Sequence, residues 1–371
     1  MNTNLLAGVI FIVVFGVVIL VHEFGHFFVG RFFKVEIEEF GIGLPPKMIS
    51  LFRWKETEFT FNWLPFGGFN RFKGENNPEI KGGLAAANPW VRLAVLLAGS
   101  TMNLLTGFLV YSILFSQIGV PNFEVVQIFE VTPGSPADQA GFRTDDIILE
   151  IDGETINGEP QLRTLIFDNL DQPINFTIQR GEEIIETTAI PSSSRAAEEG
   201  ALGFVPGYAY NESPSLLTTL SFSAETTLFY AKEILVFPAK IIRGSISPEE
   251  GRFIGFRGIY NIFQQTVDAD IESRTEVPAA ATPSDATPPT FFTLNLVATL
   301  TITLGVFNLL PFPALDGGRI FFLLPELFFR KRVPAEFENI VHGVGMMLLL
   351  GFMLYINVMD FINPANFTAI P

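Results

Sequence analysis

Four apolar runs constrain this chain more than any other feature of its sequence. They cover residues 5–29, 93–115, 291–310 and, roughly, 340–359. A helix of about 20 apolar residues is long enough to cross the hydrocarbon core of a bilayer. The alternative is a set of buried core helices in a soluble protein, but four such runs in one chain argue against it. The composition agrees, since 48% of the residues are hydrophobic and Phe occurs 40 times.

The net charge of −16 is concentrated in one region. Residues 118–290 contain 26 acidic and 10 basic residues, and the rest of the chain has no net charge. This long acidic segment lies between the second and third apolar runs. An acidic balance argues against nucleic acid as a partner.

Lys and Arg in the short connections predict the orientation in the membrane. Nine of them lie within residues 31–92, and four more follow the third run at Arg319, Arg330, Lys331 and Arg332. Connections rich in Lys and Arg remain in the cytoplasm. We therefore expect the acidic region and both termini to be extracytoplasmic. The first run has neither a basic start nor a small-residue cleavage site, so we interpret it as a retained span.

The connection between the first two runs contains a strand signal. Residues 58–64 alternate between polar and apolar side chains, residues 65–69 are typical of a turn, and residues 69–73 follow as a return strand. We expect an aromatic-rich β-hairpin next to the membrane. An ordinary cytoplasmic hairpin is the alternative.

The acidic region begins with the pattern of a small β-rich domain. We predict strands at residues 124–129 and 146–151, a short helix over 135–141, and a hairpin of 173–179 with 183–190. Residues 216–265 predict one or two amphipathic helices with breaks near Pro238 and residues 244–248. Residues 267–290, rich in Ala, Pro, Thr and acidic residues, predict an exposed linker.

The first apolar run ends with a metal-binding pattern. His22 and His26 stand four residues apart, with Glu23 directly after the first. Positions four apart share a helix face, so the two imidazoles can hold one zinc ion while the Glu serves as general base. Ionisable groups in a membrane span are costly unless they are paired or functional. A chance match is the alternative. The chain has no Cys, which excludes thiolate ligands.

A catalytic zinc needs a third protein ligand and one open position. Asp316 is the better candidate, because Pro311 and Pro313 break the third run just before it. Broken helices at membrane depth usually line a site. His342, in the fourth run, is the alternative ligand. The alternative role for Asp316 is that of a helix cap outside the membrane.

Two long motifs and one short one resemble those of a known family. The HEFGH of residues 22–26 and the NLLPFPALDGG of residues 308–318 resemble the signature motifs of the site-2 protease family of intramembrane zinc metalloproteases. Residues 99–103 are similar to its GxxxN pattern. The order of elements resembles bacterial regulator-of-sigma-E proteases. Residues 123–206 resemble a single PDZ domain, where the best-known relatives carry two, and another small β-rich module is the alternative.

The resemblance implies a catalytic centre. His22, His26 and Asp316 would hold Zn²⁺, and Glu23 would be the catalytic base. Further residues would bind substrate or support the site: Asn308 for the substrate or its developing oxyanion, Gly67, Gly68 and Phe69 in a re-entrant hairpin that pairs with an unwound substrate, and Gly99 and Asn103 from the second span.

The fold that we expect is a multi-pass α-helical membrane protein with four transmembrane helices, an inserted β-rich PDZ-like domain and a membrane-proximal β-hairpin. The expected segments are helix 1 with HEFGH (1–33), the hairpin region (34–89), helix 2 (90–118), the extracytoplasmic PDZ domain (119–207), amphipathic helices and linker (208–290), helix 3 with the LDGG motif (291–319), and a cytoplasmic connection, helix 4 and tail (320–371).

The resemblance implies a zinc metalloendopeptidase of the inner or plasma membrane that acts in regulated intramembrane proteolysis. Its partners would be the lipid bilayer and pre-trimmed single-span proteins, such as anti-sigma factors or remnant signal peptides, and no nucleic acid. A PDZ scaffold without catalysis would tolerate loss of Glu23, which is present. A metal transporter would need acidic residues in several spans, and the second and fourth runs offer almost none before Asp360.

Overall fold

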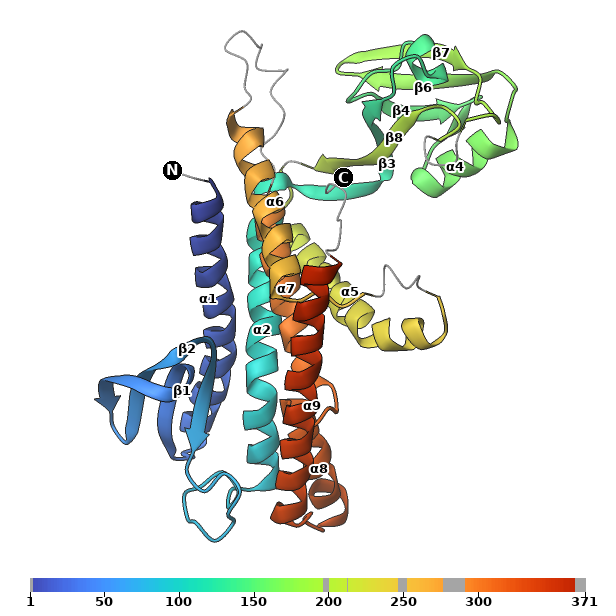
Figure 1. Cartoon of the computed structure of the whole chain (residues 1–371). Coiled ribbons are helices and arrows are strands. Elements are labelled where there is room, and N and C mark those ends of the chain that lie inside the picture. The colour runs from blue at the N-terminus through green and yellow to red at the C-terminus, as the bar shows by residue number, and fades with distance from the viewer. Residues whose placement is uncertain (1–2, 196–199, 212, 246–251, 276–290, 364–371) are drawn as a thin grey trace. The chain divides into compact units, whose positions relative to one another are not determined.

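A computed structural model describes residues 3–195, 200–211, 213–245, 252–275 and 291–363 of the chain (Figure 1). Its contacts divide the chain into two compact units. Residues 1–114 and 221–371 form the first unit, and residues 115–220 form the second. The second unit is thus inserted into the sequence of the first.

Long helices dominate the first unit. They are α1 (Thr3–Phe32), α2 (Pro89–Ile118), α5 (Leu216–Ile242), α6 (Phe256–Thr275), α7 (Phe292–Leu309), α8 (Asp316–Phe329) and α9 (Ala335–Ile362). Within the described ranges, four helical segments are long and apolar enough to cross a membrane: Leu5–Phe32, Pro89–Ile118, Phe292–Leu309 and Ala335–Ile362. These segments coincide with the four apolar runs of the sequence.

A β-sheet follows α1 in the same unit and is formed by β1 (Ile37–Trp54) and β2 (Thr57–Phe72). The turn between them lies at Lys55, which has a φ of 53°. Both strands fold back on themselves, so that β1 residues 39–42 pair with residues 58–61 on one side and with residues 68–71 on the other. The expected pairing of residues 58–64 with 69–73 is therefore wrong, since the first half of β1 lies between them.

This sheet packs against the second half of α1 (Figure 1). The contact is a cluster of buried apolar side chains from the helix, both strands, α2 and the segments that connect them, comprising Phe27, Val35, Ile37, Phe40, Phe59, Phe72, Leu84 and Val95. Phe27 lies 5.5 Å from Phe40 and 5.6 Å from Phe59, ring centre to ring centre. Burial of large aromatic rings contributes strongly to stability, so the sheet is fixed against the helix segment that bears His22 and His26.

The other half of α1 packs against α6. Ala7 and Phe11 of α1 are buried with Phe263 and Val267 of α6. Residues 267–275 are therefore helical, and the expected linker over 267–290 is wrong for this part; residues 276–290 lie outside the described residues. This segment is rich in polar residues because its helix has only one apolar face, which packs against α1.

The second unit is an antiparallel sheet with short helices. Its elements are β3 (Val120–Val131), α3 (Pro136–Gln139), β4 (Ile147–Ile151), β5 (Glu154–Thr155), α4 (Glu159–Asp168), β6 (Ile174–Arg180), β7 (Glu183–Ala189) and β8 (Phe204–Asn211). The strand order is β7-β6-β4-β3-β8, with β5 paired to β4. The predicted strands, short helix and hairpin are all present. Helix α4 and the strands β5 and β8 were not predicted from the sequence.

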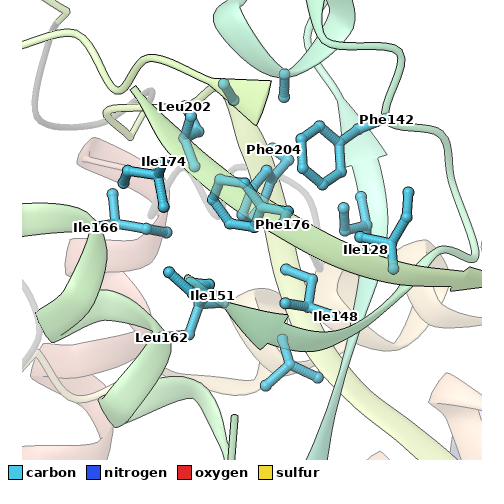
Figure 2. Close-up of a cluster of buried hydrophobic side chains, with 14 of the residues drawn as sticks. Ile128, Phe142, Ile148, Ile151, Leu162, Ile166, Ile174, Phe176, Leu202 and Phe204 are labelled. Carbon is cyan, nitrogen blue, oxygen red and sulfur yellow. The ribbon is translucent and has the colours of Figure 1, made fainter. Parts of the chain in front are cut away.

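Alternating apolar residues of these strands form the core of the second unit (Figure 2). Ile128, Ile148 and Ile178 come from three neighbouring strands, and each is 2% exposed or less. Leu162 of α4 closes one side of the core. One buried carboxylate, that of Asp146, is held by a two-bond ion pair with Arg180, with N–O distances of 2.7 Å.

Candidate functional site

The site begins with the two histidines of α1. His22 and His26 lie one helical turn apart, and both are buried, with exposed fractions of 7% and 6%. Their Nε2 atoms are 3.1 Å apart. The ring of His26 is fixed, because its Nδ1 donates a hydrogen bond to the backbone oxygen of Val95 in α2 at 2.7 Å. Its Nε2 is then the atom that remains available as a ligand.

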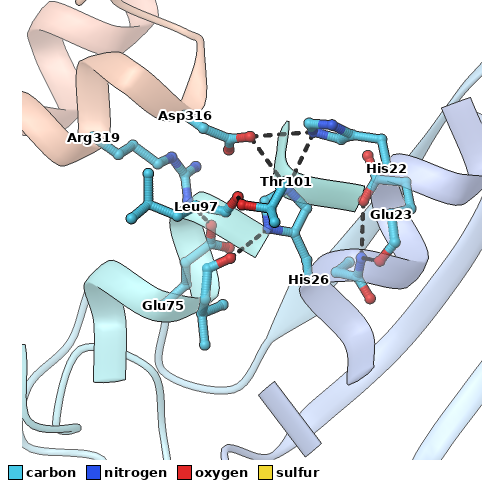
Figure 3. Close-up of polar contacts among 10 residues, drawn as sticks. His22, Glu23, His26, Glu75, Leu97, Thr101, Asp316 and Arg319 are labelled. Carbon is cyan, nitrogen blue, oxygen red and sulfur yellow. Dashed lines mark hydrogen bonds and ion pairs between the residues drawn. The ribbon is translucent and has the colours of Figure 1, made fainter. Parts of the chain in front are cut away.

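Asp316 completes the cluster from a distant part of the chain (Figure 3). One carboxylate oxygen, Oδ2, lies 3.2 Å from Nε2 of both histidines. The three groups offer ligand atoms that all lie within 4.8 Å of one another. The structure therefore brings together the three residues that the sequence analysis expected to hold a metal.

The break between α7 and α8 brings Asp316 into this position. Helix α7 ends at Leu309, and α8 starts at Asp316. In the connection, Ala314 has a φ of 81°, a left-handed conformation that costs free energy for a residue with a side chain. Its N–H donates a hydrogen bond of 2.9 Å to Nδ1 of His342 in α9. His342, the alternative ligand, therefore holds the loop before Asp316 and lies outside the metal-binding cluster.

Glycines let the helices approach closely at the site. A Cβ atom placed on Gly99 of α2 would lie 2.3 Å from Nε2 of His26 and 2.7 Å from Nε2 of His22. A Cβ atom on Gly25 would lie 2.4 Å from the backbone oxygen of Ala98. Since either position would clash with any larger residue, both glycines are needed for α2 to lie directly against the imidazoles.

The predicted base, Glu23, points to the β-sheet side of α1. Its carboxylate accepts a hydrogen bond of 2.8 Å from Nδ2 of Asn70 in β2. The same Nδ2 donates to the backbone oxygen of Glu23, also at 2.8 Å. Asn70 was not predicted as a site residue, because no sequence signal distinguishes it from other polar residues of a strand.

A second unforeseen feature is the ion pair of Arg319 with Glu75 (Figure 3). Arg319 lies one turn after Asp316 on α8, and Glu75 follows β2. Burial disfavours the charged guanidinium, but the Glu75 carboxylate outweighs this effect and raises the pKa of Arg319. The pair ties the beginning of α8 to the segment that follows the sheet.

Three more of the predicted residues lie on α2, α7 and β2. Asn103 of α2 is fully buried and faces α7, where a Cβ atom on Gly305 would lie 3.1 Å from its own Cβ. Asn308 is half-buried in the last turn of α7. Gly68 lies close to Glu23, the predicted base, since a Cβ atom placed on Gly68 would be 2.8 Å from Cγ of Glu23.

The donor set of the cluster fits zinc. Two imidazole nitrogens and one carboxylate oxygen form one of the ligand combinations of catalytic zinc sites, which keep a fourth position open. In neutral His26, the Nδ1–H bond to Val95 leaves Nε2 as an acceptor, and this atom lies 3.2 Å from a carboxylate oxygen of Asp316, so a cation between the two acceptors would be favourable. The hydrogen bond of His26 to a backbone carbonyl is typical of histidines that bind metals.

Comparison with known proteins identifies the class of this protein. Residues 10–352 match peptidase family M50, so the chain belongs to this family, the site-2 proteases. The prediction of a metalloprotease from the sequence motifs is thereby confirmed. Membership also places the protein in a membrane and gives it membrane-protein substrates.

Several relatives align with nearly the whole chain. A protein of Clostridium perfringens, named as a zinc metalloprotease, is 32% identical over 351 residues, which cover 94% of this chain and 97% of the relative. A protein of Fusobacterium nucleatum with the same kind of name is 31% identical over 355 residues, which cover 94% and 96%. The metalloprotease MmpA of Caulobacter vibrioides is 27% identical over 374 residues, which cover 92% of each chain. These names support zinc as the cofactor.

Proposed function

We propose that this chain is an intramembrane zinc endopeptidase that cleaves the transmembrane segments of single-span proteins. One observation carries the proposal. His22, His26 and Asp316 converge in a chain of family M50, and the two histidines lie within a helix that is long and apolar enough to cross a membrane. A buried cluster of this kind in such a helix is costly unless it binds or reacts.

In this proposal, Nε2 of each histidine and a carboxylate oxygen of Asp316 hold the zinc ion. Bound zinc supplies two kinds of chemistry, since it acidifies water and polarises a carbonyl oxygen. The protein contributes the geometry. Val95 orients His26, and the His342 bond to Ala314 fixes the loop from which Asp316 extends. Both contacts limit the movement of a ligand before the metal binds.

Glu23 acts as the general base and acid. It lies directly after His22 on α1, and its carboxylate takes a proton from the attacking water. It then gives that proton to the leaving amine nitrogen, which completes the hydrolysis. Asn308 of α7 holds the substrate or its developing oxyanion, while Gly99 and Asn103 support the site from α2.

The sheet presents the substrate as an extended strand. Residues 68–71 of β2 pair with β1 on one side, and within the described residues their other side has no strand partner. A peptide bond in a helix is not accessible to attack, so an unwound substrate segment adds to this free edge at Gly67, Gly68 and Phe69. A Cβ atom placed on Gly68 would lie 2.8 Å from Cγ of Glu23, which supports a substrate-binding edge next to the base.

The substrate class follows from the rest of the chain. We assign the second unit as a single PDZ domain on the extracytoplasmic side, together with both termini, because the Lys- and Arg-rich connections remain in the cytoplasm. The four apolar helices are then four spans. The domain excludes proteins with large external parts, so the substrates are pre-trimmed proteins such as anti-sigma factors or remnant signal peptides, in regulated intramembrane proteolysis.

The experiment is a cleavage assay in proteoliposomes with matched zinc analysis. Wild-type protein should hold about one zinc per chain and cut a trimmed single-span substrate. Glu23→Gln should keep the zinc and lose at least about 100-fold in rate, the contribution of a general base. Equal cleavage by Glu23→Gln would refute the role of Glu23. A protein without zinc would contradict the ligand assignment.

A further inference from the structure

Asn70 makes two hydrogen bonds to the same residue, and that residue is the proposed base. Its Nδ2 lies 2.8 Å from the backbone oxygen of Glu23 and 2.8 Å from the carboxylate oxygen Oε2. The backbone oxygen can only accept, so the amide must turn its NH₂ group, with two N–H donors, toward Glu23. The side chain of Asn70 is thereby fixed, and with it the orientation of the carboxylate.

The position of Asn70 in the sheet links this contact to substrate binding. Asn70 pairs with Phe40 of β1, and Gly68, two residues earlier on the same strand, pairs with Ile42. Gly68 also touches Cγ of Glu23, as its missing Cβ would lie 2.8 Å away. The strand segment that offers its free edge to a substrate is therefore the segment that contacts both the stem and the carboxylate of the base.

We propose that Asn70 is a positioning residue for Glu23 and that it makes the orientation of the base depend on the placement of the substrate-binding strand. The inference rests on the proposed function, because it assigns to Glu23 the role of base. A free Glu side chain has three rotatable bonds. The double contact with Asn70 restricts it to one arrangement, so little reorganisation is needed when the proton is transferred.

A purely structural role makes a different prediction. If Asn70 only joins the sheet to α1, stability depends on its volume and on its hydrogen bond to the backbone oxygen of Glu23. The hydrogen bond to the Glu23 carboxylate then has no effect on catalysis. Loss of Asn70 would then lower stability and substrate binding together. If Asn70 positions the base, its loss lowers kcat while KM remains unchanged.

Three substitutions separate these roles. Asn70→Val keeps most of the volume and removes the donors; Asn70→Asp keeps the shape and replaces the donors by a negative charge; Asn70→Gln keeps the donors on a longer side chain. We expect kcat to fall about 10- to 100-fold in Asn70→Val and Asn70→Asp, the usual effect of losing a partner of a catalytic group. Asn70→Gln should retain more activity than either. KM should stay within about twofold and zinc content should not change.

Asn62→Val is the matched control. Asn62 is a buried residue of the same strand, and its amide donates to the backbone oxygen of Gly43 at 3.1 Å, within the sheet. This variant should lower the melting temperature at least as much as Asn70→Val but reduce kcat less. A parallel loss of kcat and stability in both variants would overturn the inference. So would an Asn70→Gln variant less active than Asn70→Asp.

An exchange of donor and acceptor tests the hydrogen bond between Asn70 and the Glu23 carboxylate by thermal stability, without a cleavage assay. In Asn70→Asp, two carboxylates face each other, and we expect the melting temperature to fall by about 1–3 °C, because the shift for a given destabilisation becomes smaller as the chain becomes longer. Adding Glu23→Gln restores a donor opposite the introduced carboxylate, so the double variant should regain at least half of the loss. No regain would overturn the inference.

The cleavage assay and the thermal melts together distinguish a failure of this inference from a failure of the proposed function. If wild-type protein cuts no single-span substrate, the proposed function fails, and the exchange of donor and acceptor still decides whether Asn70 holds the carboxylate of Glu23. If wild-type protein cuts the substrate and Asn70→Val is equally active, the proposed function stands and the inference fails.

Discussion

Gly99→Ala is the substitution that tests the geometry of the metal site most directly. Gly99 is the point at which α2 lies against the imidazoles of α1. The new methyl group would stand 2.3 Å from Nε2 of His26 and 2.7 Å from Nε2 of His22. Ordinary van der Waals contact begins at 3.4 Å. The imidazole of His26 must therefore move by about 1 Å, and that of His22 by somewhat less.

This displacement is large on the scale of a metal site. Zinc–nitrogen bonds are about 2.0–2.1 Å long and tolerate deviations of about 0.2 Å. A movement of about 1 Å is five times that tolerance, so we expect zinc affinity to fall at least about 10- to 100-fold. The fold should survive, because alanine is a better helix former than glycine by about 1 kcal/mol.

The assay is competition of the purified protein with a zinc chelator, together with a thermal melt of the metal-free protein. Gly16→Ala is the control. Gly16 lies on α1, the helix that carries both histidines, and a Cβ atom placed on it would meet nothing within 4 Å. Its affinity for zinc should equal that of the wild type. Wild-type affinity in Gly99→Ala would show that the imidazoles do not lie against Gly99 and would refute the described geometry.

Three further predictions concern other parts of the chain. A reporter inserted within residues 181–200 should report the extracytoplasmic side and one at Lys331 the cytoplasm; the opposite result would reverse the topology. Arg180→Ala removes the ion-pair partner of the buried Asp146 carboxylate and should lower the free energy of unfolding by about 2 kcal/mol, as measured by proteolysis in urea. The loss is smaller than for a fully buried ion pair, because Arg180 is partly exposed. His342→Ala should weaken zinc binding about 10-fold, whereas Asp316→Ala should abolish it; equal zinc loss in both, measured by zinc titration, would contradict the separation of their roles.

The sequence predicted the two histidines of the metal cluster because the relation between them is local. His22 and His26 share a helix face by spacing alone. Two prolines before Asp316 indicate the helix break that positions its side chain. For the third ligand, residue type and spacing favoured Asp316 but left His342 open, and the full ligand set came from the family resemblance. The apolar runs likewise predicted the long helices, since length and composition decide whether a helix can cross a bilayer.

The sheet was predicted in part only, because strand pairing is not local. The alternation of residues 58–64 revealed a strand, but nothing in it indicates that residues 37–44 lie between this strand and residues 68–72. Asn70 was missed for the same reason. Its contact with Glu23 joins residues 47 positions apart, and it exists only once the sheet is packed on α1.

The ligands of the metal cluster come from opposite ends of the polypeptide. His26 and Asp316 are separated by about 290 positions, so a ribosome that adds roughly 5–20 residues per second reaches Asp316 about 15–60 s after His26. During this interval the first helix already carries its two histidines and Glu23, but it has no third ligand. On the proposed ligand set, a growing chain would lack its third zinc ligand, and the order of synthesis itself would keep it from cutting its neighbours in the membrane until Asp316 has been made.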